Sequence, residues 1–362
     1  MRRILFQLAA GLLFLCPAPA VRSRTAAPAL PQTAANSARI ASITVTGTDR
    51  YQPDQIAAAG KIQVGDVVTA PEIQQAADRL AALGIFSKVN YRFTTKNDEI
   101  AIEFQITAAP TYPLLFDNFP WFTDSDIANA IRSEVGLFAG ESPGGGAMVD
   151  EITDALEKLL MSRNIQGKVT HQLVARPFGD GMLMQFHVDG PVLRVQSVEF
   201  DDALARGSER LKDRIPDIQG QPYSRFAIEL FEGEQVRPLY ASNGFLRAKI
   251  GAPVAHLASD SAGPGGSGVD VLISIAPGPV YTWAGVTWRG NAVFSVSNLN
   301  AAIDLKAGDA ANEMKLGGDW QDIQADYRRI GYLDAKLTPK AQYDDAAHRV
   351  SYEVSVVEGP QY

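Results

Sequence analysis

The sequence predicts an α+β protein made of four tandem repeats, each with the element order β-α-α-β-β. Two marks recur in register along the chain and support this prediction. The first is a strand that ends each repeat in proline, at Pro110, Pro191, Pro279 and Pro360, with spacings of 81, 88 and 81 residues. The second is a helix end followed at once by an apolar residue and a strand, at Gly84, Asn164, Gly244 and Gly331. Self-similarity at a fixed period is typical of repeat architectures, so it outweighs the two or three domains that the length alone suggests.

The second mark has a steric reason. Glycine and asparagine tolerate the left-handed conformation in which many helices end, so they are expected where a helix gives way to a strand. A further glycine stands between the two helical stretches of each repeat, at Gly65, Gly136, Gly220 and Gly308. These positions divide the chain into predicted repeats at residues 39–110, 111–191, 192–279 and 280–362.

Repeat one shows each element in turn. A strand over residues 40–47 is followed by a short helix around Ile56. A second helix opens at Thr69-Ala70-Pro71-Glu72, which is a capping box with proline in the first turn, and carries apolar residues on one face. Residues 89–93 and 100–106 alternate apolar and polar side chains on either side of a turn at 96–98, which predicts a hairpin.

The other repeats follow this order with differing fidelity. In repeat two we expect a strand at 114–116, helices from Thr123 and around Ile152, and strands at 169–174 and 182–188, with a middle loop lengthened by residues 143–146. In repeat three a strand at 195–200 precedes a helix near Ser208 and a longer helix that Pro238 kinks or restarts, and residues 261–268 form a flexible insert. Repeat four has a strand at 283–288, two helices, and strands near 335 and 350–356.

The start of the chain predicts export. Residues 1–20 combine a basic start, an apolar run and the small-x-small signal Ala18-Pro19-Ala20, which together are typical of a cleaved signal peptide. Its apolar run is shorter than the roughly 20 residues that span a membrane. Cys16 invites comparison with a lipoprotein signal, but Leu15 before it is not small. Residues 21–38 are rich in Ala, Pro and Ser and are expected to be a disordered linker.

The composition of the remaining chain excludes some classes of function. It contains no cysteine, so disulfides and thiol chemistry are ruled out. Removal of Arg2 and Arg3 leaves 31 basic and 41 acidic residues, and this negative balance opposes binding to nucleic acid. Catalytic and phosphate-binding motifs are absent, and we predict neither a cofactor nor a metal. His171 and His187, on adjacent predicted strands, are the only histidines that could meet, and two ligands do not close a zinc site.

Three stretches resemble the POTRA (polypeptide-transport-associated) domain, which stands in tandem in the periplasmic part of outer-membrane protein assembly factors. They are Gly65-Asp66, the run Leu80-x-x-Leu83-Gly84-Ile85-Phe86-x-x-Val89, and the ending Glu358-Gly359-Pro360. The resemblance implies a three-stranded mixed sheet with two helices on one face in each repeat. It also implies a periplasmic scaffold, without enzymatic activity, that binds unfolded outer-membrane proteins or accessory assembly subunits and reaches the outer membrane through a partner. The chain stops at Tyr362, where assembly factors continue into a barrel, so we expect either a relative without a barrel or a fragment.

Sheet edges are the expected binding sites, because their unpaired backbone groups can accept an extended peptide. The resemblance implies that the strand after the second helix is an edge in each repeat. Proline restricts pairing at such an edge, and it occurs in repeats three and four, at Pro253 and Pro339. We therefore expect the better edges in repeats one and two, with the candidate residues Val89, Tyr91, Phe93, Val169, His171 and Leu173.

Two alternatives stay open at this point. Aromatic residues such as Tyr91 and Phe93 are more often buried in packing than exposed to partners, and the whole chain could be a passive docking or spacer arm. The apolar cluster Phe119-Pro120-Trp121-Phe122 is either a surface anchor or a hydrophobic staple before the next helix, and the staple is favoured.

Overall fold

The computed structural model describes residues 37–258 and 268–362. The predicted signal peptide, the linker up to residue 36 and residues 261–267 of the predicted insert lie outside the described residues. Ala38, predicted to end the linker, is instead the first residue of the first strand, because it pairs with Val68.

Repeat one confirms the predicted order and adds one short strand. Its elements are β1 (Ala38–Thr46), α1 (Pro53–Ala59), β2 (Val67–Val68), α2 (Ala70–Ala82), β3 (Phe86–Lys96) and β4 (Glu99–Ala108). The sheet order is β2-β1-β4-β3, with β1 parallel and β3 antiparallel to β4. Helix α2 begins with the predicted capping box, in which the Thr69 backbone N–H donates to Glu72 at 2.7 Å. Strand β3 lies at the end of the sheet order and is therefore an edge of the sheet, as the resemblance implied.

Repeat two has the same order. Its elements are β5 (Thr111–Phe116), α3 (Asp124–Glu134), β6 (Glu141–Pro143), α4 (Ala147–Ser162), β7 (Lys168–Ala175) and β8 (Met182–Asp189). Its sheet order is β6-β5-β8-β7. Helix α3 starts at the predicted residue, because the Thr123 hydroxyl accepts the Asp126 backbone N–H at 3.1 Å.

Repeat three is the most broken. Its elements are β9 (Arg194–Phe200), α5 (Ala203–Gly207), α6 (Glu209–Lys212), η1 (Ile215–Asp217), α7 (Arg225–Phe231), the π-helical η2 (Glu232–Val236), α8 (Arg237–Ser242), β10 (Lys249–Ile250), β11 (Val254–Leu257), β12 (Gly268–Ile273) and β13 (Ile275–Ala276). The main sheet has the order β11-β12-β9, and β10 pairs with β13. The predicted break at Pro238 is confirmed, since a π-helical turn separates α7 from α8 directly before it.

Repeat four is regular. Its elements are β14 (Thr282–Arg289), α9 (Val296–Ala301), α10 (Glu313–Arg329), β15 (Lys336–Asp344) and β16 (Arg349–Val357), and its sheet order is β14-β16-β15. Pro339 lies inside β15 and does not interrupt its pairing with β16. A proline is tolerated there because its nitrogen faces away from the neighbouring strand.

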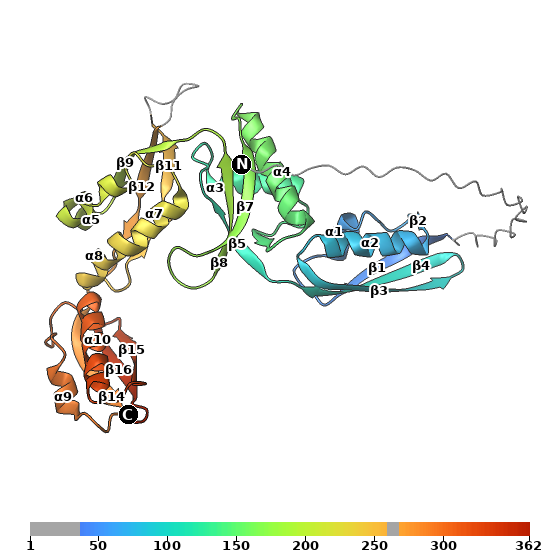
Figure 1. Ribbon diagram of the computed structural model, residues 1–362. Coiled ribbons are helices and arrows are strands. Elements are labelled where there is room, and N and C mark those ends of the chain that lie inside the picture. Colours follow the sequence, from blue (N-terminus) through green and yellow to red (C-terminus); the bar gives the residue numbers. More distant parts are fainter. Residues whose placement is uncertain (1–36, 259–267) are drawn as a thin grey trace, which may run out of the picture.

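The repeats follow one another in an extended, bent chain, and in each the helices lie beside the sheet (Figure 1). Repeats one and two share one apolar core, whereas repeats three and four each have their own. No helix among the described residues is long and apolar enough to cross a membrane.

The second face of the sheet differs between the first two repeats. In β4 of repeat one, Ile102 and Phe104 are buried under the helices, while Glu103 and Gln105 on the other face are less buried or exposed. In β8 of repeat two, consecutive residues are buried, so both faces are covered. The second face of repeat two lies against α7 of repeat three, which contacts β5. Repeat two is thus enclosed between its own helices and its neighbour.

Candidate peptide-binding edges and the junction groove

No strand of the described residues pairs with the outer edge of β3. Its hairpin with β4 turns through Asn97 and Asp98, both with positive φ, so Lys96 and Glu99 form the hydrogen-bonded pair that closes a two-residue turn. Backbone groups alternate in direction along an antiparallel strand. Because Lys96 bonds inward to β4, the odd-numbered residues before it turn their N–H and C=O groups outward. These residues include the predicted Val89, Tyr91 and Phe93.

The side chains of these three residues face the helices. Val89 and Tyr91 pack against the shared core, and the Tyr91 hydroxyl donates to Gln74 on α2 at 2.9 Å. The Phe93 ring stacks on Tyr91 with centroids 6.4 Å apart and stays 40% exposed. The aromatic residues are thus partly packing residues, and what β3 offers to a partner is its backbone together with the Phe93 ring.

Strand β7 has a similar edge with one position taken. The Val169 backbone N–H donates to the Glu157 side chain of α4 at 3.0 Å, so this residue faces outward rather than toward β8. By alternation His171 and Leu173 also face outward. Of the three residues predicted in this strand, Val169 already uses its backbone N–H within the chain. His171 and Leu173 are therefore the two candidates for pairing with a client strand.

His171 and His187 do not meet, which corrects the expectation that these two could. His171 lies toward the helices, with Nδ1 3.3 Å from the Thr153 hydroxyl of α4. His187 lies on the opposite face, with Nδ1 3.0 Å from a carboxylate oxygen of Asp117. Their strand positions are adjacent but their parity differs, since His171 pairs with Phe186. Among the described residues there is no group of three or more His, Asp or Glu that could hold a metal ion.

Asp117 organises the junction between repeats two and three, and the sequence did not single it out as a site. Its buried carboxylate accepts hydrogen bonds from the Ser224 hydroxyl at 2.7 Å and from the Phe226 backbone N–H at 2.9 Å. Its carbonyl accepts the Arg225 N–H at 2.9 Å. A carboxylate of repeat two therefore caps the first turn of α7 in repeat three.

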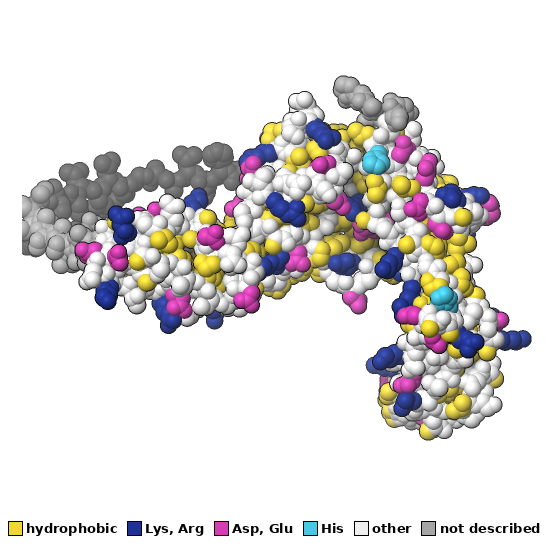
Figure 2. All heavy atoms as spheres, turned by 180° about the vertical axis from the view of Figure 1, so that it is seen from behind, with side chains coloured by type: hydrophobic (Ala, Val, Ile, Leu, Met, Phe, Trp, Pro, Cys, Tyr) yellow, Lys and Arg dark blue, Asp and Glu magenta, His cyan; other side chains and the backbone are white. Residues whose placement is uncertain are grey.

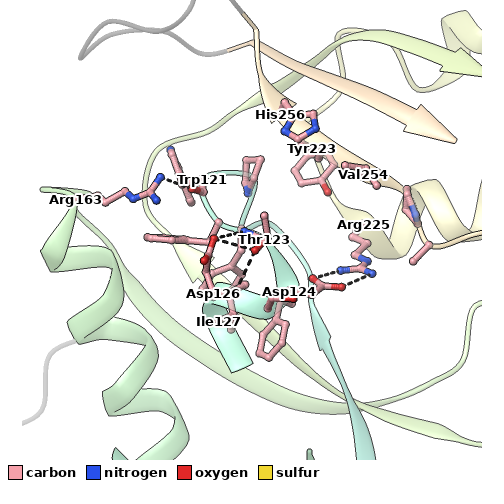
Figure 3. Close-up of a pocket in the computed structure, with 18 residues that line it drawn as sticks. Trp121, Thr123, Asp124, Asp126, Ile127, Arg163, Tyr223, Arg225, Val254 and His256 are labelled. Carbon is pink, nitrogen blue, oxygen red and sulfur yellow. Dashed lines mark hydrogen bonds and ion pairs between the residues drawn. The ribbon is translucent and has the colours of Figure 1, made fainter. Parts of the chain in front are cut away.

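An ion pair and a cavity continue this junction. Arg225 holds Asp124 through two hydrogen bonds of 2.7 and 3.0 Å. Beside them lies a cavity of about 470 Å³, which we name the junction groove. Its walls come from Phe119, Trp121, Phe122 and Arg163 of repeat two and from Tyr223 and residues 252–256 of repeat three (Figure 3).

The predicted Trp121 cluster is therefore neither simply a staple nor a free anchor. Trp121 packs against the core of repeats one and two and also against the core of repeat three. Phe122 stands directly before the cap Thr123, and it lines the groove together with Ile127. Sequence reasoning marked these residues, but the strand that faces them lies more than 120 positions away and left no signal.

A second, smaller cavity of about 210 Å³ lies at the other end of α7. There the hairpin residue Phe178 of repeat two lies under the Arg237 guanidinium, 4.1 Å from its carbon to the ring centre. Burial raises the pKa of Glu232 to about 8, and the neighbouring Glu229 adds to this rise. One Glu232 carboxylate oxygen is buried without a hydrogen bond among the described residues.

A comparison with protein-family models matches the two most regular repeats, one and four. The POTRA family model, described as a surface antigen variable number repeat, matches residues 38–109 and 281–359. An assigned outer membrane protein assembly factor of Treponema pallidum (strain Nichols) is 28% identical over 189 residues. The match covers 51% of this chain and 22% of that protein, so the chain spans about a fifth of this relative's length.

Solved structures with similar chains include POTRA3-5 of Haemophilus influenzae BamA, with 9% identity, a TM-score of 0.35 and coverage of 88% of this chain and 96% of that one. Another is POTRA1-3 of the periplasmic domain of Omp85 from Anabaena, with 13% identity, a TM-score of 0.22 and coverage of 90% and 96%. The family match covers repeats one and four, and these two repeats are therefore similar to POTRA domains.

Proposed function

We propose that this chain is a periplasmic scaffold of outer-membrane protein assembly or secretion, which holds client or accessory polypeptides by strand addition at β3 and β7. The similarity to an outer membrane protein assembly factor supports the assembly role. The observation that carries the binding mode is the pair of long edge strands, of 11 and 8 residues, with outward backbone positions that no strand of the described residues pairs.

Strand addition suits this role because it relies on backbone hydrogen bonds. Such bonds are common to every unfolded outer-membrane polypeptide, so one edge can hold many client sequences. The exposed rings and aliphatic side chains beside the edge, Phe93 and Leu173, can add contacts with alternate residues of a client.

A passive docking or spacer arm is the second candidate, and the buried polar junction at Asp117 favours it. A chain whose only task is to hold a distance needs stiff junctions, but it does not need open edges. The two functions therefore differ in what happens when an edge is blocked while the fold is kept.

Proline at an outward position blocks an edge without removing a bond inside the sheet, and Pro339 in β15 is the native precedent. We expect Phe93→Pro and His171→Pro, combined in the full chain, to weaken capture of a urea-unfolded outer-membrane barrel protein. The weakening should be about tenfold, as expected when several backbone bonds of an interface are lost.

The readout is the dissociation constant by fluorescence anisotropy, together with crosslinks from a photoreactive residue in the client. Phe93→Thr with His171→Thr is the matched control, since threonine keeps both N–H groups and suits a strand. Unchanged capture by the double proline variant, with its circular dichroism intact, would leave the spacer arm as the better function.

A further inference from the structure

The junction groove lies directly against an open strand edge of repeat three. Its lining includes the five consecutive residues 252–256. Side chains on one face of a strand recur at every second residue, so a cavity that touches all five must border the edge of the strand. No strand of the described residues pairs with this side of β11, whose only partner is β12.

A hydrogen bond at the end of β11 shows which of its residues point their backbone groups toward β12 and which point away from it. The Ala258 N–H donates to the Gly268 carbonyl of the neighbouring segment at 3.0 Å, so even-numbered residues bond inward. Ala255 and Leu257 then turn their N–H and C=O toward the groove. Pro253 has the same parity, so its missing N–H removes one outward donor and leaves these two residues able to pair.

The opposite wall is aromatic and firmly held. The Trp121 carbonyl accepts from Arg163 at 2.7 Å, and the same guanidinium lies over the Phe122 ring, 4.7 Å from its centre. Trp121 is wedged between the two cores, and Tyr223 is buried beneath the rim. Figure 3 shows Tyr223, Val254 and His256 on the side of repeat three and Trp121 with Thr123 on the side of repeat two.

Charge at the rim favours an acidic guest group. The Asp124 carboxylate accepts two hydrogen bonds from Arg225. The Asp126 carboxylate accepts a hydrogen bond from the hydroxyl of the cap residue Thr123 at 2.8 Å. Arg163 has a carbonyl and a ring as neighbours and forms no salt bridge within the described part of the chain. The pKa of Asp126 is lowered mainly by the hydrogen bonds of Thr123 and further by the charge of Arg163. One cation is therefore left without a salt-bridge partner beside the aromatic wall. In the space-filling view, apolar side chains also gather where repeats two and three meet (Figure 2).

We propose that the junction groove binds an extended polypeptide segment of a partner, by pairing with the edge of β11. A large aromatic side chain of the segment enters the cavity against Trp121 and Phe122, and an acidic residue beside it pairs with Arg163. This inference rests on the strand addition proposed above. The inference adds a third edge strand, β11, in repeat three, where Pro253 led us to expect a poorer edge. It also gives this edge a preference for particular side chains, which strand addition at β3 and β7 does not require.

The test uses the full chain and a blocked seven-residue peptide of alternating threonine and valine, with phenylalanine at its centre and glutamate next to it. A second peptide carries alanine at the centre, and a third carries a photoreactive phenylalanine analogue there. We expect the photoreactive peptide to crosslink to residues 119–122 and 252–257. We expect the central alanine to weaken binding about tenfold, which is typical of a buried aromatic anchor.

Two variants remove the two halves of the site independently. Trp121→Ala should weaken binding of the phenylalanine peptide about tenfold and leave the alanine peptide nearly unchanged. Ala255→Pro should weaken both peptides, because it removes an outward N–H. Ala341→Pro in β15 is the matched control, since Ala341 is also a partly buried alanine two residues from Pro339 in an edge strand. This control should bind the phenylalanine peptide as the unchanged chain does.

The outcomes separate this inference from the proposed function. Equal binding of the phenylalanine peptide by the unchanged chain, Trp121→Ala and Ala255→Pro overturns the groove. If the crosslinks then lie on β3 or β7, strand addition still stands. A peptide that binds no variant and an unfolded barrel protein that is not captured would overturn both. Should Ala255→Pro fail to fold, Trp121→Ala with the two peptides decides the question alone.

Discussion

The junction between repeats one and two depends on close backbone contact, whereas the junction between repeats two and three depends on buried polar side chains. At the first junction a Cβ on Gly84 would lie 1.9 Å from the carbonyl oxygen of Gly145. The Met148 N–H of α4 also donates to the Leu83 carbonyl at the end of α2, at 3.3 Å. One helix end thus meets the next helix start, and the apolar core runs through both repeats.

At the second junction the apolar cores of the two repeats are separate clusters, and a carboxylate of repeat two forms hydrogen bonds with repeat three. Asp117 is 3% exposed and accepts hydrogen bonds from Ser224 and Phe226 of the next repeat. Arg225 pairs with Asp124 beside it. A polar junction of this kind is costly to leave half satisfied, so it specifies one arrangement of the two repeats.

The comparison shows that one repeated fold can be joined in two physically different ways. Backbone contact tolerates no side chain but is insensitive to pH and salt. A buried carboxylate tolerates changes of shape nearby but responds to protonation and to the loss of any one partner. Each junction should therefore fail under a different substitution.

The largest expected effect is that of Gly84→Ala. The new methyl group collides with the Gly145 backbone, and φ is +86° at this residue, so both the contact and the conformation are lost. We expect a loss of about 4 kcal/mol in the free energy of unfolding of repeats one and two, typical of a large steric conflict in a core. Urea unfolding of the full chain, followed by hydrogen exchange in α2 and α4, measures it.

Gly65→Ala isolates the contact from the conformation. Gly65 has a similar φ of +97°, but nothing lies within 4 Å of the position of its Cβ. This variant should lose only the conformational part, about 1 kcal/mol. Equal losses for the two variants would show that backbone contact contributes little to the first junction.

Asp117→Ala is expected to have the next largest effect, at the other junction. It leaves the Ser224 hydroxyl and the Phe226 N–H without their acceptor in a buried site, which should cost about 3 kcal/mol. Hydrogen exchange of the first turn of α7 should rise before that of α8. Glu141→Ala provides the comparison at the first junction, because its pair with Arg50 is half exposed and should contribute less than about 1 kcal/mol.

The sequence analysis marked residues that form the first junction, without predicting the contact between them, and marked fewer residues of the second. Gly84 was identified because a helix end needs a left-handed residue, and Gly144 to Gly146 stood out as a glycine run, although the run was interpreted only as a longer loop. Asp117 and Arg225 carry no local signal, since each looks like an ordinary strand-end or helix-start residue and they lie 108 positions apart. The repeat order followed from periodicity, and the edge strands followed from the POTRA resemblance. The groove depends on the angle between repeats, which neither of them contains.

The smallest expected effect is a pH dependence of the second junction near neutral pH. The pKa of Glu232 is raised to about 8, first by burial and then by Glu229, while Arg225 and Arg237 oppose the rise. Arg176 of the repeat-two hairpin lines the same cavity. A raised carboxyl pKa means that the docked state favours the protonated form. The stability contribution is complete below the ordinary pKa of glutamate and is lost as pH rises through about 8.

Opening of α7 should therefore become easier by about 1 kcal/mol between pH 7 and pH 8, which follows from one proton bound more tightly in the docked state. Hydrogen exchange of α7, corrected for the intrinsic rate at each pH, measures this opening in the full chain. Glu232→Gln should flatten the dependence, because the amide is neutral at every pH. Glu234→Gln is the matched control on the same turn, where the side chain is exposed, and it should keep the wild-type slope. An unchanged slope in Glu232→Gln would assign the pH response to another group.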